Sequence, residues 1–565
     1  MKQHQPHKPT QQRRLRNGAY AIAAVAILAG VGIAALALPR DPARAAAPVA
    51  ASAQPGAATP GAVAPALAAP SVFPLSPFGR LNAAGPKRLA AAEPVAGPQA
   101  QRKAELAAYE TMEMPADFVP VSADGATENA PFARIRLAEF SSGQRAIDLL
   151  GADLAPVANW YGMTAASLSQ LLLSDASVHL DRKGRIVHID EGVGATAGGA
   201  TAEATTAATG TATAAGTPFP LDQTFKLHTK PDSTRVLFID FNGQGANPGF
   251  DLDKVAATYS TAERLLIQKV WQRVAEDFAA FDVDVTTEAP AVVAGKIGAT
   301  VLVTPQASSA GGYAYLNSFA AFAANAAPAF CFPNNLANSE KPIAECVSHE
   351  AGHTLGLRHQ GTAATAYYTG HGDGQTGWAP IMGVGYYKNL TQWSKGQYLS
   401  ADNKEDAYAV MARQGLKARV DDHGGAPALA TTLTGVNANG LSNLNFGGLV
   451  GVPGDVDMFR FVAGAGMLTL KAAGAALGSN VDILLQVYDG AGRLLASANP
   501  VDGLDASLSV NLALPGTYYV SVTGAGVGDP LKTGYTNYGS IGRYSVSASA
   551  ALALPSLKLA AAPTR

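Results

Sequence analysis

The chain contains few charged residues and few cysteines for its length. Of its 565 residues, 15% are charged, and 41 basic residues face 43 acidic ones. This near-neutral balance argues against a nucleic-acid partner, because such partners are held largely by neutralising phosphates. The sequence has two cysteines, Cys331 and Cys346. So few cysteines exclude a disulfide-dense small scaffold and a cysteine-rich zinc or iron–sulfur centre.

The N-terminus has the layout of an export signal. Basic residues, among them Arg13 and Arg14, precede an uncharged apolar run over residues 19–38. We therefore expect a signal peptide over residues 1–45 and a secreted, extracytoplasmic protein. The run is also long enough to span a membrane, so an uncleaved anchor is the alternative and the one membrane contact expected. In an oxidising compartment Cys331 and Cys346 are expected to form a disulfide, with metal ligation by these thiols as the alternative.

The next part of the chain alternates between low-complexity and ordinary sequence. Two stretches are low in complexity: an Ala/Pro-rich spacer over residues 46–131 and an Ala/Thr/Gly linker over residues 194–218. Such composition is typical of disordered connections. Between them, residues 132–193 predict a small propeptide-like unit with two short helices, around residues 146–150 and 168–172. A hairpin over residues 178–189 is expected to complete it.

Residues 219–420 form the longest globular stretch and predict an α/β domain. Strands are expected at residues 236–241, 283–287 and 300–304, and Ser260 with Glu263 predicts a capping box that starts a long core helix. A sheet backed by helices follows from this mixture. The remaining chain predicts a linker over residues 421–430, an all-β sandwich over residues 431–550 and a tail over residues 551–565.

One histidine motif carries the chemistry. Three of the ten histidines lie within eleven residues, as His349, His353 and His359. Residues four apart share a helix face, so His349 and His353 can present two imidazoles to one metal ion. Glu350 lies beside them, where it can act as general base on a metal-bound water. Gly356 can end the helix in the left-handed conformation and return His359 as a third ligand, as at a catalytic zinc.

This motif resembles that of the metzincin zinc endopeptidases. The resemblance covers residues 219–420 and implies a multidomain protein whose α/β domain has a twisted mixed sheet, long helices and one zinc on the active-site helix. It also implies a methionine turn, for which Met382 is the candidate. In some metzincins a tyrosine two residues after this methionine binds zinc or the oxyanion. Here Val384 takes that position, so Tyr386 and Tyr387 are candidates, with ordinary packing as the alternative.

Other features of the resemblance leave choices open. Gln360 follows the third histidine, so the metzincin subfamily stays undetermined. His371 is expected to be a loop residue, with a further ligand as the alternative. Residues 314–319 are the candidate for the edge strand that holds substrate in this family. The C-terminal region resembles the bacterial pre-peptidase C-terminal family, in some members associated with calcium. Asp457 and Asp482 are therefore the calcium candidates, with solvated turn residues as the alternative.

These observations predict a secreted, monomeric zinc endopeptidase that acts on protein or peptide substrates and is made as a zymogen. Both cysteines lie after residue 219, so a propeptide cysteine cannot block the zinc. Blockage would use a carboxylate, a histidine such as His179 or His188, or steric occupation, and a segment that only assists folding is the alternative. Two other functions remain open. One is an exported binding protein with a structural zinc site, and the other is a metal-dependent hydrolase of a non-peptide bond.

Overall fold

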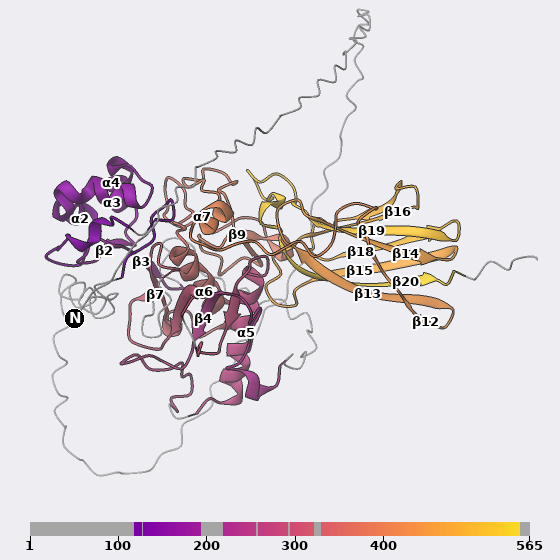
Figure 1. Cartoon of the computed structure of the whole chain (residues 1–565), viewed down its shortest axis with the longest axis horizontal. Coiled ribbons are helices and arrows are strands. Elements are labelled where there is room, and N and C mark those ends of the chain that lie inside the picture. Colours follow the sequence, from indigo (N-terminus) through magenta and orange to yellow (C-terminus); the bar gives the residue numbers. More distant parts are fainter. Residues whose placement is uncertain are drawn as a thin grey trace, which may run out of the picture. The chain divides into compact units, whose positions relative to one another are not determined.

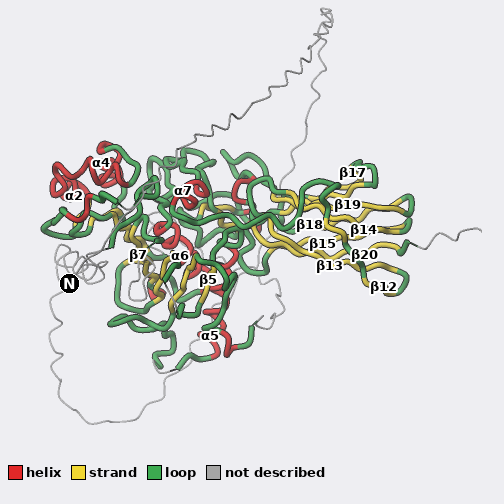
Figure 2. The backbone as a smooth tube through the Cα atoms, viewed as in Figure 1, coloured by secondary structure: helices red, strands yellow, loops and turns green. Residues whose placement is uncertain are grey.

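The computed structural model describes residues 118–126, 128–193, 219–255, 258–291, 294–320 and 329–553. All of them belong to one unit, residues 92–565. The fold of these residues is mostly β, with several sheets and some helices (Figure 2). None of the helices in the described ranges has the length and apolar composition needed to cross a membrane. The expected signal peptide, the linker over residues 194–218 and most of the spacer lie outside these ranges.

The largest sheet in the described residues has eight strands in the order β1-β2-β3-β7-β8-β6-β4-β5. Pairing is parallel among β8, β6, β4 and β5 and antiparallel from β8 through β7, β3 and β2 to β1. It is therefore a mixed sheet, as expected. In the order of the sheet, the strands are β1 (Ser141–Ser142), β2 (Val178–Leu180), β3 (Ile186–Glu191), β7 (Ala310–Tyr315), β8 (Ala329–Cys331), β6 (Ile297–Val303), β4 (Arg235–Asp240) and β5 (Asp284–Thr286).

Two long helices pack together against this sheet. In α5 (Thr261–Asp277) the capping box of Ser260 and Glu263 is present, as expected. The second, α6 (Glu340–Thr354), contacts β6, β7, β8 and α5, and its residues from Ile343 to Thr354 are buried. Figure 1 labels both helices beside β4 and β7. The other described helices are α2 (Gly143–Leu150), α3 (Leu154–Trp160), α4 (Ala165–Ser174) and α7 (Ala407–Arg413), with 3-10 turns at Pro131–Ala133, Gly151–Asp153, Leu221–Gln223, Pro333–Asn335, Gly374–Thr376 and Asn537–Gly539.

The N-terminal segment, defined here as residues 118–193, joins the sheet of the α/β region. The expected hairpin is present as β2 and β3, and β3 pairs with β7 so that Asp190 lies opposite Gly312. The segment has an apolar core of its own, but Leu316 from the α/β region belongs to that core. Residues expected in the spacer also pack, since the Val121 amide donates to the Asn317 carbonyl at 3.0 Å. The sequence composition predicted a spacer up to residue 131, whereas the structure already describes packed chain from residue 118.

The expected edge strand at residues 314–319 is wrong in both its bounds and its place. The strand β7 covers Ala310–Tyr315, and it lies between β3 and β8 inside the sheet. Its free edge has been taken by β3 of the N-terminal segment. An unpaired strand edge accepts another extended chain through backbone hydrogen bonds. Without the N-terminal segment, β7 would present a strand edge of this kind.

The C-terminal region contains two five-stranded sheets, with orders β11-β14-β19-β16-β17 and β12-β13-β20-β15-β18. Side chains along β16 alternate between buried and half-buried, which is the pattern of strands with one face in a core. The first sheet comprises β11 (Thr431–Thr432), β14 (Val456–Ala463), β19 (Gly516–Gly524), β16 (Ile483–Tyr488) and β17 (Leu494–Ala498). The second comprises β12 (Val436–Ala438), β13 (Leu441–Val450), β20 (Gly542–Ala551), β15 (Gly466–Gly474) and β18 (Ala506–Leu512).

Buried polar contacts connect this C-terminal region to α5. The Arg543 amide donates to the Glu276 carboxylate at 2.8 Å, and the Asn480 amide donates to the Asp277 carboxylate at 2.9 Å. Asp277 also accepts from the Ser348 hydroxyl at 2.5 Å, one residue before the first histidine of the motif. Burial raises the pKa of Glu276 to about 7 despite the opposing Arg543 charge. Without the C-terminal region, Glu276 and Asp277 would lose the hydrogen bonds from Arg543 and Asn480. The C-terminal region therefore packs against the α/β region through these buried contacts.

Candidate metal centre

The helix α6 presents the first part of the motif as the spacing predicts. His349, Glu350 and His353 lie in its last two turns, and all three are buried. The helix ends at Thr354, and Gly356 has a φ of 90°, the left-handed conformation expected of it. A Cβ at this glycine would also crowd Asn317. The chain then turns back and brings His359 against the helix, with ring centroids 4.8 Å from His353.

Each histidine of the motif has its Nδ1 fixed by an acceptor. Nδ1 of His349 donates to the Ile381 carbonyl at 2.8 Å, and Nδ1 of His353 donates to the Leu357 carbonyl at 2.7 Å. For His359 the acceptor is a carboxylate oxygen of Asp175, at 2.7 Å. A carbonyl can only accept, so Nδ1 carries the proton in His349 and His353, and their Nε2 lone pairs are left free. An acceptor behind each ring is the usual arrangement of metal-ligating histidines.

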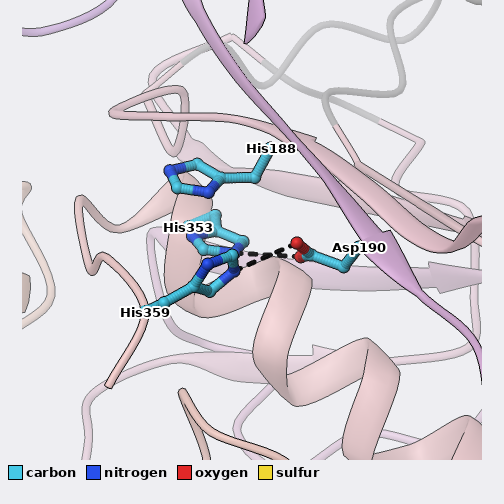
Figure 3. A group of neighbouring side chains, drawn as sticks. All are labelled: His188, Asp190, His353 and His359. Carbon is cyan, nitrogen blue, oxygen red and sulfur yellow. Dashed lines mark hydrogen bonds and ion pairs between the residues drawn. The ribbon is translucent and has the colours of Figure 1, made fainter. Parts of the chain in front are cut away.

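Asp190 of β3 faces these lone pairs, as Figure 3 shows for His353 and His359. Its Oδ2 lies 3.1 Å from Nε2 of His353 and 3.4 Å from Nε2 of His349, and its Oδ1 lies 3.0 Å from Nε2 of His359. The Nε2 atoms of His353 and His359 are 3.1 Å apart. Imidazole nitrogens and a carboxylate at this range can share a proton or hold a metal cation between them.

The donor set fits zinc. Zinc bonds of about 2.0 Å give a tetrahedron with ligand atoms about 3.3 Å apart. The four separations among these atoms, from 3.0 to 3.4 Å, bracket that value. Three imidazole nitrogens and one carboxylate are ligands that zinc accepts. His349, His353, His359 and Asp190 are therefore candidate ligands, and His188 is a further one, because it offers a ligand atom within 4.8 Å of those of Asp190, His353 and His359.

Electrostatics keep Asp190 ionised in this buried place. Burial opposes ionisation, but His359 and His353 outweigh it and hold the pKa of Asp190 well below its usual range. Burial also acts against the charged form of His359, yet Asp190 and Asp175 raise its pKa to about 10. For His353 burial dominates and lowers the pKa to about 4. The cluster therefore has a negative group at its centre, held by its histidine neighbours.

Glu350 lies beside the cluster, and its carboxylate packs against Gly312 of β7. A Cβ on Gly312 of β7 would collide with the Glu350 carboxylate, so glycine is required at that position. Its Oε2 has no hydrogen-bond partner among the described residues. Burial, and then the Asp190 charge, raise the pKa of Glu350 well above its usual value. A raised pKa favours the protonated carboxyl, so Glu350 can take a proton from a nearby water only after it has ionised.

Met382, the candidate for the methionine turn, packs against α6. A Cβ on Gly352 of α6 would meet the Met382 sulfur, so the thioether packs against the helix backbone between His349 and His353. The turn lies between β9 (Trp378–Pro380) and β10 (Leu390–Gln392), which pair in parallel. The peptide before the turn also supplies the Ile381 carbonyl that fixes His349. This segment therefore supports the helix from below.

The tyrosine candidates have different surroundings. Tyr386 lines a small pocket beside Asp190, together with Cys346 and Val384, whereas Tyr387 is 59% exposed. The hydroxyl that does reach the cluster belongs to Tyr367, which donates to Oδ1 of Asp190 at 2.8 Å. The Tyr367 ring lies 4.3 Å from that of His359. No spacing rule in the sequence could have singled out Tyr367.

The two histidines of the N-terminal segment take separate places. His188 stacks on His353 with ring centroids 3.9 Å apart, and its nitrogens have no hydrogen-bond partner in the described part of the chain (Figure 3). It lies on the same face of β3 as Asp190, because alternate strand residues share a face. His179 instead packs beside Phe140, and its Nδ1 donates to the Ser177 carbonyl at 2.8 Å. The carboxylate is thus the group of the segment that meets all three motif histidines.

The expected disulfide is absent, which corrects the prediction. Cys331 and Cys346 are both free and buried. The Cys346 thiol donates to the Gly311 carbonyl at 3.4 Å, and the Cys331 thiol donates to the Ile343 carbonyl at 3.8 Å. Burial raises the pKa of Cys346 well above its usual value, which makes the reactive thiolate rare. Neither cysteine belongs to the group of neighbouring metal-ligand side chains formed by His188, Asp190, His353 and His359.

His371 and the calcium candidates lie apart from this cluster. The Tyr368 hydroxyl lies 2.7 Å from Nδ1 of His371, and the other ring nitrogen donates to the Gly534 carbonyl at 2.6 Å. Asp457 forms an acidic group with Asp421 and Asp422, and its Oδ1 has no partner among the described residues. Asp482 is not in that group and accepts from the Tyr535 hydroxyl at 2.9 Å. Calcium binding stays a prediction.

Comparisons with known proteins reach about a fifth of the chain. No protein-family model matches it, and no curated protein matches it significantly. Among solved structures, the pre-peptidase C-terminal domain of a collagenase from Bacillus anthracis is similar at 19% identity, over 22% of this chain and 99% of that chain, with a TM-score of 0.16. PliG, a periplasmic inhibitor of g-type lysozyme from Aeromonas hydrophila, is similar at 16% identity, over 21% and 96% of the two chains, with a TM-score of 0.15. These scores are too low to inform function.

We predict that His353→Ala weakens zinc binding by the full-length chain at least ~100-fold, because outer contacts alone are worth up to that much. Metal content after dialysis against a weak chelator measures the effect. His371→Ala is the matched control and should keep its zinc. Equal zinc content in the two variants would contradict the ligand assignment.

Proposed function

We propose that the chain is the latent form of a secreted zinc endopeptidase of the metzincin type. The observation that carries this proposal is the convergence of three Nε2 atoms, each backed by an acceptor at Nδ1, beside the partly unpaired carboxylate of Glu350. A structural zinc site has no use for a carboxylate beside the ion that is not a ligand. Gly312 and Gly352 support the same proposal, because they make space for Glu350 and Met382.

The roles of this chain's residues follow from their positions. Zinc, when bound, polarises a peptide carbonyl and acidifies a water molecule. Glu350 would take the proton from the attacking water and deliver it to the leaving amine. Tyr367 would donate its hydroxyl to the oxygen that gains negative charge, because that hydroxyl already donates to a carboxylate oxygen at the same place.

Latency in this proposal depends on Asp190. Its carboxylate occupies the position that a catalytic zinc keeps open for water or substrate. The strand β3 that carries it also covers the edge of β7, where an extended substrate would pair. The Ala/Thr/Gly linker begins after residue 193, so a cut there would separate this segment from the catalytic region. Among the routes left open by the sequence, the contacts of Asp190 support blockage by a carboxylate, and the pairing of β3 with β7 supports steric occupation.

A second function is favoured by one specific observation. Asp190 would add a fourth protein ligand to the three motif histidines, and four protein ligands are typical of a structural zinc site. In that case the chain would be an exported binding protein, with the C-terminal region as its binding part. The two functions differ in the effect of a linker cut. A structural site keeps Asp190 and stays inactive, whereas a zymogen becomes a peptidase.

We predict that Glu350→Ala keeps its zinc but lowers casein hydrolysis by the processed enzyme at least ~10²-fold, which is the usual worth of a positioned general base. Zinc content and initial rates are measured on the same preparations. Hydrolysis that is equal in variant and parent would refute the role of Glu350.

We predict that Asp190→Ala gives the full-length chain partial activity before any cut in the linker, because the fourth ligand position opens while the pairing of β3 with β7 remains as the second block. The measurement is casein hydrolysis by intact chain, with integrity checked by mass spectrometry. Glu191→Ala is the matched control, since Glu191 is the exposed neighbour on the same strand and should stay latent. A latent Asp190→Ala chain that becomes active only after linker cleavage would rule out this carboxylate as the block.

We predict that Tyr367→Phe lowers kcat of the processed enzyme by ~10²-fold with little change in KM, as for loss of one oxyanion donor. Tyr368→Phe is the control, because its hydroxyl contacts His371 instead. A kcat that is unchanged in Tyr367→Phe would remove this hydroxyl from the mechanism.

A further inference from the structure

The three motif histidines differ in where their orienting groups come from. His349 and His353 donate to the carbonyls of Ile381 and Leu357, which lie in the α/β region and remain with it after a linker cut. His359 donates instead to Asp175, which lies in the N-terminal segment, 184 residues earlier in the chain. The third histidine is therefore oriented by a part of the chain that the proposed maturation removes.

Asp175 is held in place for this contact. It follows the last residue of α4, and its side chain is buried. Its Oδ1 accepts from the Ser177 amide at 3.0 Å and from the Ser177 hydroxyl at 2.8 Å. These two bonds leave Oδ2 to accept from Nδ1 of His359 at 2.7 Å. A carboxylate that is fixed on one side and bonded to an imidazole on the other is a preorganised partner.

The third histidine depends on such a partner more than the other two. His349 and His353 are fixed by the helix backbone of α6, whereas His359 lies beyond the helix end, after the left-handed Gly356. A carboxylate behind a ligating imidazole fixes its tautomer and raises the basicity of the nitrogen that binds metal. Loss of an outer partner of this kind typically weakens metal binding 10- to 100-fold.

We propose that Asp175 makes the N-terminal segment part of the zinc site, as a positioning residue that orients His359 and tightens zinc binding in the unprocessed chain. The segment then has two distinct contacts with the site, one through Asp190 and one through Asp175. Zinc is bound most tightly before processing and less tightly once the segment has left. This inference rests on the proposed zinc site and adds a role for the segment in loading the metal.

The test measures zinc affinity of the full-length chain by competition with a chromophoric chelator. Asp175→Ala should weaken zinc binding about 10- to 100-fold. Asp175→Asn should recover part of the lost zinc affinity, because the amide oxygen of asparagine can still accept from Nδ1 of His359. The asparagine variant also replaces the alanine variant in the test if the latter does not fold. Asp153→Ala is the matched control, since Asp153 pairs with Arg134 in the same segment and away from the zinc site.

A double-mutant cycle makes the test specific to His359. In a His359→Ala background, Asp175→Ala should cause no further loss, because the side chain through which it acts is gone. An equal loss in both backgrounds, or an unchanged affinity in Asp175→Ala, overturns the proposal. The test measures zinc binding and not activity. A chain that binds zinc as expected but never hydrolyses casein would therefore refute the peptidase function, while the role of Asp175 in zinc binding would stand.

Discussion

Three imidazole lone pairs that converge on one buried carboxylate are the constraint on which the rest of the site depends. The site is buried, and within it Asp190 accepts from the Tyr367 hydroxyl and lies 3.1 Å from Nε2 of His353. In the proposed zinc site, a cation would join these groups as ligands. The backbone carbonyls behind His349 and His353, the carboxylate behind His359 and the glycines that admit Glu350 and Met382 all serve this one arrangement.

Strand pairing sets the position of Asp190 as firmly as its charge does. In an antiparallel pair a shift of one residue would turn every side chain of β3 to the opposite face. The observed register places Asp190 opposite Gly312 and His188 opposite Ala314, so both side chains face α6. Small residues on β7 let the strand and the helix approach closely. Backbone pairing and ligation therefore act together, and a peptide that lacked the carboxylate could still occupy this edge through the same backbone bonds.

The part of the site that the sequence predicted is the part encoded locally. Helix spacing fixes the relation of His349, Glu350 and His353, and one glycine suffices to return His359. Asp190 precedes His353 by 163 residues, and no local pattern relates the two. The β2–β3 hairpin itself was predicted, but its pairing with β7 was not, because an isolated hairpin carries no sign of which sheet edge it will meet. Both cysteines are free and buried, although the Cys331 thiol lies beside that of Cys346 and adds to the rise of its pKa.

Long-range polar contacts also explain why the C-terminal region cannot be treated as a separate module. Glu276 and Asp277 end α5, and both are buried carboxylates whose partners include Arg543 and Asn480 of the two-sheet region. Burial is the largest cause that raises the pKa of Asp277 to about 7, and the nearby Glu345 charge adds to it. The same Asp277 accepts from Ser348, the residue before His349. A change in the C-terminal region is thereby connected through one buried acid to α6, the helix that carries His349 and His353.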